Sequence, residues 1–356
     1  MAIELLPAVE LLLAAFAGGV LGAAVGGLPA FSLAGVAIVV GEAVTAAGNG
    51  PGVTDSAGAG VLDAAGITGV VGLGPALGPH VAFAGGVAAA AYAGRRGDVI
   101  DSDFHYHQAK DIATALGTDP RVLAVGGVFG IVGVVLARAM VGVGAPWDPI
   151  AMAVVLSALL HRLVFGYPLI GDLHGGLLDM TPFEDDERWH MTGTPEEAGS
   201  PGGAPAADGD PRYVVEPWLP HQYEWANVSL LGFAAGLFGG YVALATGSVF
   251  FAFGLSVASL LFLALGTESF PVTYHMVYPA SLVALGLGDV PAVAAVLVAG
   301  VFGLLGGLAG ELAQRVLYAH ADTHLDPPMV AIVLTTLLIS LLTTAGVLQQ
   351  STIPAL

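Results

Sequence analysis

Histidine, tyrosine and carboxylate side chains inside apolar segments are the residues of this chain best suited to bind a solute. His80 and His275 each stand near the start of a short apolar segment, and Tyr274 and Tyr278 flank the second histidine. Imidazole titrates near neutral pH, so the pair suits binding of a polar solute or a proton-coupled step. The alternative interpretation is structural, with each histidine capping a short helix at the membrane interface and each tyrosine anchoring it among headgroups.

Ionisable residues within membrane spans are costly and therefore mark functional candidates. Glu42 lies near the end of the second apolar segment, and Glu268 lies just before the segment that carries His275. We add both to the histidines and tyrosines as candidate substrate-binding residues. Arg138 and Glu311 have simpler explanations, because an arginine in a last turn reaches the surface and Glu311 can pair with the arginine four residues on.

A second group of residues has the spacing of metal ligands. His320 and His324 are four residues apart, with Asp322 between them, and would place both imidazoles on one face if that stretch is helical. The metal interpretation is a weak cation site at a pore mouth, and the alternative is a solvated acidic loop with incidental histidines. No cofactor is indicated. The chain has no cysteine and no phosphate-loop or nucleophile-elbow motif, so we expect no enzymatic activity; a metal-dependent membrane enzyme using these three residues is the least favoured hypothesis.

The composition requires lipid as the solvent for these segments. The chain is 56% hydrophobic and 10% charged, whereas soluble domains carry roughly 25% charged residues. Runs of about 20 apolar residues span a bilayer. We predict an all-α, multi-pass cell-membrane protein with about ten transmembrane helices, near residues 9–28, 30–47, 79–94, 122–143, 149–168, 227–246, 248–266, 271–287, 291–318 and 328–348.

Acidic residues concentrate between the two groups of spans. The net charge is −19, and residues 171–225 hold 12 acids against two arginines. Acid-rich loops with a single lysine are typical of proteins from extremely halophilic archaea. Without a basic patch, nucleic acid is excluded as a partner. The Pro/Gly-rich part from Gly193 to Asp210 is expected to be disordered.

The chain repeats itself in the same order in its two halves. The motif Gly-Val-Phe-Gly at 127–130 returns at 300–303, and each half also has an Asp-Pro pair before its last span. Asp is a good helix N-cap and Pro fits the first turn, so this pair is interpreted as a cap. Aligning the halves matches residues 31–35 with 250–254, 80–83 with 275–278, and Asp148 with Asp326.

Five spans in each half is an odd number, so the halves must cross the membrane in opposite directions. We therefore predict two five-helix inverted repeats, residues 1–170 and 226–356, joined by a partly disordered acidic linker, residues 171–225. The basic residues fit a cytoplasmic linker, since Arg95, Arg96, Arg162 and Arg315 would then all lie inside. The apolar, glycine-rich stretch 61–77 fits a re-entrant segment.

The third and eighth spans are short, and the eighth contains Pro279. Short or broken segments at matching positions of inverted halves indicate a substrate site. In span number and in this pair, the chain resembles five-plus-five inverted-repeat transporters and channels, such as the urea-transporter and bile-acid-symporter folds. The resemblance implies a channel or secondary transporter for a small solute or ion. The alternative is a non-transporting scaffold that binds a partner protein through its acidic linker or lateral helix faces, and a homo-oligomer fits either function.

Overall fold

The computed structural model describes residues 9–49, 66–96, 106–189 and 212–349, which form helices and connecting turns without a β-strand. In the first half the helices are α1 (Val9–Val25), α2 (Gly27–Asn49), α3 (Ala84–Arg96), α4 (Pro120–Gly142) and α5 (Pro149–Phe165). In the second half they are α8 (Trp225–Thr246), α9 (Phe251–Ala264), α10 (Tyr274–Gly286), α11 (Ala292–Leu317) and α12 (Pro327–Thr344). The short helix α6 (Thr181–Glu184) lies in the linker.

Each of the ten apolar segments expected from the sequence contains one of these helices. Five of them are long and apolar enough to cross a membrane, namely α2, α4, α8, α11 and α12, whereas α1, α5 and α9 are shorter apolar helices. The third segment begins with a π-helical turn, η3 (Pro79–Phe83), before α3, and Pro279 lies inside α10. A membrane protein is therefore supported by the length and composition of these helices.

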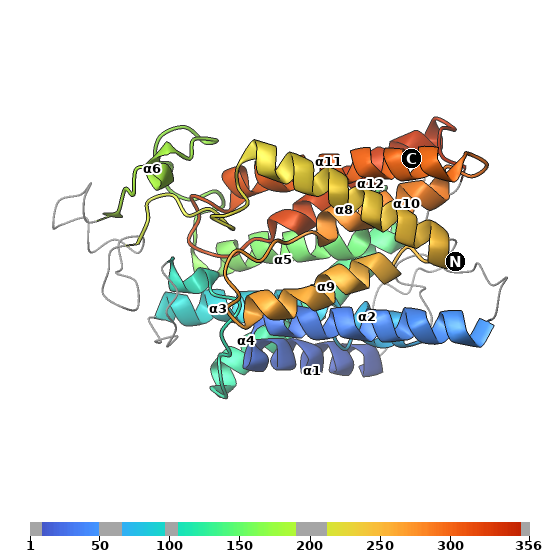
Figure 1. The fold of residues 1–356 in the computed structure, drawn as a ribbon. Coiled ribbons are helices and arrows are strands. Elements are labelled where there is room, and N and C mark those ends of the chain that lie inside the picture. Colours follow the sequence, from blue (N-terminus) through green and yellow to red (C-terminus); the bar gives the residue numbers. More distant parts are fainter. Residues whose placement is uncertain (1–8, 50–65, 97–105, 190–211, 350–356) are drawn as a thin grey trace.

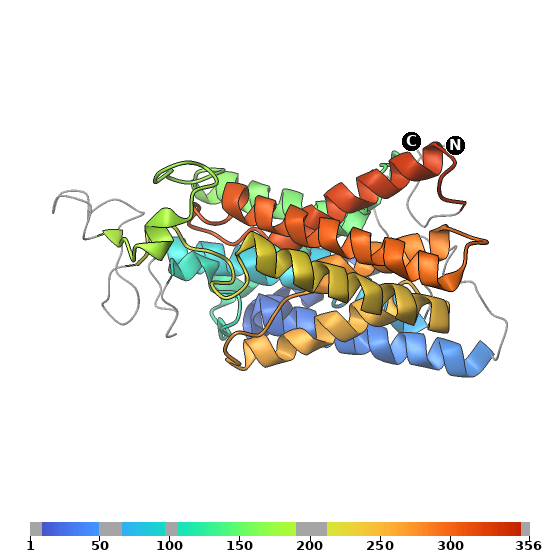
Figure 2. The same ribbon diagram turned by 45° about the horizontal axis from the view of Figure 1, so that its top comes forward.

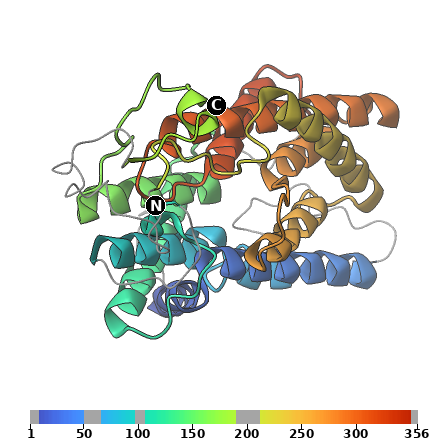
Figure 3. The same cartoon turned by 60° about the vertical axis from the view of Figure 1, so that its left-hand side comes forward.

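The long helices lie side by side, with α6 and the neighbouring linker residues at one end of the bundle (Figures 1 and 2). Viewed from that end, the helices of the first half, blue to green, and those of the second, yellow to red, form two groups that meet where α9 lies beside α2 (Figure 3). The expected disordered segment 193–210 lies within residues 190–211, outside the described residues. Residues 61–65, the first part of the stretch interpreted as re-entrant, also lie outside the described residues. The later part of that stretch contains the π-helical turn η2 (Thr68–Gly72).

Glycines allow the same close helix contacts in both halves. A Cβ added to Gly130 of α4 would lie 2.3 Å from the carbonyl oxygen of Ala15, and one added to Gly303 of α11 would lie 2.2 Å from that of Gly232. These are matching positions of the repeat. The Gly-Val-Phe-Gly motif therefore serves packing of α4 on α1 and of α11 on α8, because a larger residue there would separate the backbones.

Two pairs of helices join the halves, and each pair is antiparallel. Along α2 and α9, Gly35 lies against Ala258, while seven residues later Glu42 accepts a hydrogen bond from Ser248. Along the other pair, the backbone N–H of Asp148 before α5 donates to Thr336 of α12. His161, near the end of α5, contacts Thr323, just before α12. Residue numbers rise on one helix as they fall on its partner in both cases.

Aspartates cap the last helix of each half, as the Asp-Pro pairs predict. The Asp148 carboxylate accepts the N–H of Ala151 at 2.7 Å, and that of Asp326 accepts the N–H of Met329 at 3.0 Å. Each bond satisfies one of the N–H groups that an α-helix leaves free at its start. Both carboxylates are buried.

We expect Gly133→Ala to destabilise the fold, because a Cβ at Gly133 of α4 would lie 1.5 Å from the carbonyl oxygen of His80. Inserting a methyl group into a packed core costs about 1–3 kcal/mol. Thermal unfolding of the purified protein in detergent measures the loss. Gly176→Ala is the control, since the exposed Gly176 has a single neighbour at 3.6 Å. Equal unfolding midpoints for the two variants would contradict this account of the contact.

Candidate functional site

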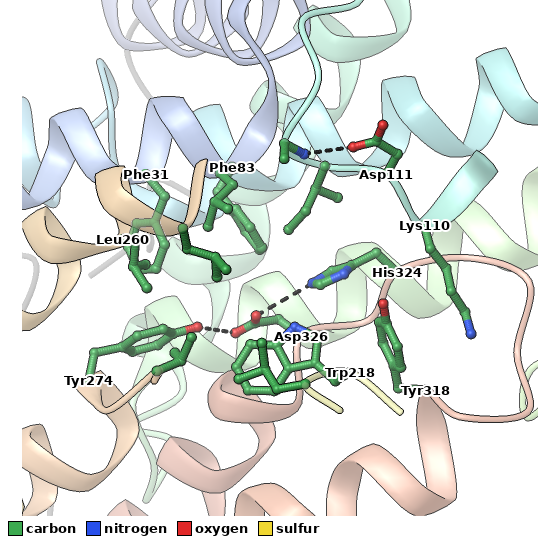
Figure 4. A pocket seen from close by; sticks show the side chains of 16 residues that line it. Phe31, Phe83, Lys110, Asp111, Trp218, Leu260, Tyr274, Tyr318, His324 and Asp326 are labelled. Carbon is green, nitrogen blue, oxygen red and sulfur yellow. Dashed lines mark hydrogen bonds and ion pairs between the residues drawn. The ribbon is translucent and has the colours of Figure 1, made fainter. Parts of the chain in front are cut away.

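A cavity of about 240 Å³ lies between the two halves. Its walls come from α2, η3, α9 and the start of α10, together with the chain before α4, the chain before α12 and Trp218 and Leu219 of the linker. Ligand pockets for drug-sized molecules occupy roughly 300–1,000 Å³, so this cavity suits a smaller solute. Figure 4 shows the side chains around it.

Asp326 is the carboxylate that lies between the tyrosine and the histidine of this cavity (Figure 4). Its Oδ2 accepts a hydrogen bond from the Tyr274 hydroxyl at 2.5 Å and from the Met329 N–H. Its Oδ1 faces Nε2 of His324 at 3.5 Å. Burial lowers the pKa of His324 despite the opposing effect of Asp326, so the imidazole is neutral near pH 7 and does not cancel the carboxylate charge.

Aromatic rings form a continuous part of the cavity wall. Phe31 of α2 packs against Phe83 with ring centres 5.4 Å apart, and edge-on against Tyr274 at 5.2 Å. Phe83 also meets the His324 ring edge-on. Such tilted and edge-on pairs fix ring orientation more firmly than aliphatic contacts do. Tyr318 and Trp218 complete the aromatic lining.

A network of buried ion pairs lies beside the cavity and ties three loops together. The ammonium of Lys110 lies 2.6 Å from Glu216 of the linker and 4.4 Å from the centre of the Tyr318 ring. Arg212 reaches both Glu216 and Asp322, at 3.2 and 3.0 Å. Two cations and two anions therefore balance, and the linker is fixed to the chain before α12. Burial lowers the pKa of Lys110 to about 8, against the opposing effect of Glu216.

A second, much smaller cavity of about 20 Å³ surrounds Asp148. Oδ2 of Asp148 accepts a hydrogen bond from the Tyr278 hydroxyl at 3.1 Å. The Tyr278 ring stacks on Phe250 at 6.0 Å, and Pro79 is also part of the wall. The space is enough for about one water molecule, so side chains fill this region almost completely.

The two cavities are lined by matching residues of the repeat. The alignment that pairs His80 with His275 also pairs Phe83 with Tyr278 and Pro79 with Tyr274. With Phe31 matched to Phe250 and Asp326 to Asp148, four wall residues of the large cavity have their partners in the small one. The large cavity holds Phe31, Phe83, Tyr274 and Asp326, and the small one holds Phe250, Tyr278, Pro79 and Asp148.

The structure places the sequence-predicted histidines away from both of these cavities. His275 is buried beside Gly310 and lines a cavity of about 10 Å³ with Glu311 and Gln314. His80 is buried in the π-helical turn, and its carbonyl packs against Gly133. The two tyrosines that flank His275, by contrast, each reach one of the capping aspartates.

The two predicted glutamates lie apart from these cavities and from each other. Glu42 is buried and accepts hydrogen bonds from Thr68 and Ser248, at 2.8 and 2.5 Å, which joins α2 to η2 and α9. Glu268 is exposed in the turn between α9 and α10. Glu311 forms the expected pair with Arg315 at 2.6 Å, and Arg138 is exposed.

The three residues with metal-ligand spacing lie in the non-helical chain between α11 and α12, so their spacing does not place them on one helix face, and they have separate partners. His320 contacts the carbonyl of Leu177, Asp322 binds Arg212, and His324 faces Asp326. Within the described part of the chain, no three His, Cys, Asp or Glu residues are grouped so that they could hold a metal ion.

Two wall residues of the large cavity, Lys110 and Asp326, were not predicted from the sequence as site residues. Lys110 is the one lysine of the chain, and it stands next to Asp111 in the connection between α3 and α4. A lone lysine in such an acidic sequence was a usable signal. Asp326 was interpreted as a helix cap alone, although its Oδ1 is left for other partners once Oδ2 serves the cap.

We expect the proton of Lys110 to make stability depend on pH, because its pKa falls from 10.5 to about 8 on folding. Over that window the unfolded chain binds more protons, so stability should rise with pH, by about 3 kcal/mol. The unfolding midpoint of the purified protein, measured against pH, tests this. Lys110→Met should flatten the rise, and the same pH slope in both proteins would contradict the assignment.

Comparison with known proteins shows the family of this chain. No curated protein and no solved structure matches this chain. A family of unknown function, DUF7973, matches over residues 1–356. The cavities, the capping aspartates and the buried ion pairs all fall within the matched region, and the chain belongs to the family DUF7973.

Proposed function

We propose that this protein is a secondary transporter for a small solute, built from two inverted repeats in the membrane. The cavity at Asp326 is the substrate site, opened toward the linker. The much smaller cavity at Asp148 is the same pathway on the opposite side of the membrane. The observation that carries this proposal is the matched lining of a large and a small cavity.

The antiparallel contacts between the halves support the inversion. Matching helices of two inverted repeats must run in opposite directions, and α2 with α9 and α5 with α12 both do so. The glycine contacts of α1 with α4 recur in α8 with α11, so the internal packing of the halves agrees as well. Sites between such halves are typical of secondary transporters.

The difference between the cavities favours a transporter over a channel. A channel needs one continuous path, whereas here a cavity of about 240 Å³ at Asp326 stands against a separate cavity of about 20 Å³ at Asp148. Tyr278, hydrogen-bonded to Asp148 and stacked on Phe250, occupies the side of the small cavity. Alternating access requires the two inverted halves to exchange conformations, so that the cavity at Asp148 opens when the cavity at Asp326 closes.

The cavity also weighs against the scaffold function. A scaffold needs no space at its centre, and the linker residues from Val214 to Pro217 are buried and so not free for a partner. Arg212 and Glu216 are buried in ion pairs, and Val215 is fully buried. Arg162, also buried, donates to carbonyls of Leu169 and Leu317 at the linker end, which suits a cytoplasmic linker.

Thiol labelling from each side of the membrane tests the proposal. The chain has no cysteine, so single variants can be made directly. In reconstituted vesicles, Phe31→Cys should react with a membrane-impermeant thiol reagent from the linker side alone. Phe250→Cys, at the matching position, should react from the other side alone and more slowly. Val87→Cys, buried outside both cavities, gives the background rate.

Two results would contradict the transporter. Reaction of both cysteines from both sides would show a continuous pathway and favour a channel. Rates no higher than that of Val87→Cys at both positions would show a dry centre and favour the scaffold.

A further inference from the structure

Charge and aromatic surface together define what the large cavity can hold. Two carboxylates, Asp111 and Asp326, and one ammonium, Lys110, belong to its wall. The Lys110 charge is already compensated by Glu216 at 2.6 Å, and Figure 4 shows its side chain running past Tyr318. Lys110 with Glu216 is neutral as a pair, so the remaining charge of the wall is negative.

Asp326 lacks a permanent cationic partner. Its neighbours are the hydroxyl of Tyr274, the N–H of Met329 and the imidazole of His324, and no arginine or lysine within the described residues forms an ion pair with it. Asp322, four residues earlier, is paired with Arg212. A buried carboxylate without a counter-charge is expensive, and a bound cation would remove that cost.

The rest of the wall suits a cation that carries carbon. Phe31, Phe83 and Tyr274 present contiguous rings beside Asp326, and ring faces attract cations within about 6 Å of their centres. The lining between the rings is aliphatic, including Leu28, Leu260 and others. Such a surface contacts alkyl groups well and offers few hydrogen bonds to a hydroxylated or anionic solute.

An inorganic cation fits this wall poorly. Hard cations need about six oxygen ligands or retained water to replace their hydration shell. The described residues contain no cluster of three His, Cys, Asp or Glu that could supply such a set. Asp111 adds one free oxygen at most, because its Oδ1 accepts the N–H groups of Ala113 and Thr114 while its buried Oδ2 has no hydrogen-bond partner among the described residues.

We propose that the substrate of the Asp326 cavity is a small organic cation of the alkylammonium class. Asp326 provides the counter-charge, and the rings of Phe31, Phe83 and Tyr274 enclose the alkyl groups. This inference rests on the transport function proposed above and names its substrate class.

Three probes of one shape and different charge test it. Tetramethylammonium, tert-butanol and pivalate are similar in size but positive, neutral and negative. Added to the purified protein in detergent at constant ionic strength, tetramethylammonium should raise the unfolding midpoint in a saturable manner, since a ligand of the folded state stabilises it. The other two should not. Equal stabilisation by tert-butanol, or stronger stabilisation by pivalate, would overturn the proposal.

Asp326→Asn isolates the charge, because asparagine also caps a helix and should leave α12 intact. We expect it to weaken tetramethylammonium binding at least tenfold. Asp119→Asn is the matched control: Asp119 also caps a helix, α4, but lies partly exposed beside Arg121, away from the cavity. Its affinity should equal that of the unaltered protein. Unchanged affinity in Asp326→Asn, with its unfolding midpoint preserved, would also overturn the proposal.

A second variant addresses the rings. Phe31→Leu keeps an apolar side chain but removes one ring. It should weaken the binding of tetramethylammonium several-fold without creating affinity for tert-butanol. Full affinity in this variant would contradict a role of the aromatic wall in binding the cation. Side-specific thiol labelling does not depend on ligand charge. One-sided labelling without tetramethylammonium binding would therefore contradict the proposed substrate class and still support the transport function.

Discussion

The centre of this protein depends on two buried carboxylates that each perform two tasks. Asp148 and Asp326 cap the last helix of their half, and each also accepts a hydrogen bond from a tyrosine of α10. Helix starts placed inside an apolar protein need such partners, because their free N–H groups cannot reach water. The same requirement brings a negative charge to the wall of each cavity, so the structural need and the candidate chemistry arise from one pair of residues.

Close backbone contacts make this arrangement possible. Gly133 and Gly306 admit the carbonyl groups of His80 and His275 at the breaks where α3 and α10 begin. Without side chains at those glycines, the broken segments pack directly on α4 and α11 and leave the centre free for the tyrosines and aspartates. The histidines thus matter for the position of their backbone, whatever their imidazoles do.

The sequence predicted the helices well and the cavity poorly, for physical reasons. Apolar runs, Asp-Pro caps and repeated glycines are local signals, and they identified every described helix of the two halves. The cavity walls combine residues that are far apart in the chain, such as Phe31, Trp218 and Tyr274, so no local pattern reveals them. The histidines were favoured because they match between the halves. The carboxylates are instead bound by Tyr274 and Tyr278, whose matching residues in the first half, Pro79 and Phe83, carry no hydroxyl group.

That mismatch has a consequence for the repeat. Both hydroxyls belong to α10, one turn apart, whereas Pro79 and Phe83 occupy the matching places in the first half. A single helix therefore holds both aspartates, and the duplicated halves are not energetically equal. In the proposed transport cycle, the halves would exchange roles, and the inverted arrangement would lose whatever hydrogen bonds α10 cannot re-form. The empty protein would then prefer to face one side of the membrane, and the two hydroxyl groups on one helix would set that preference.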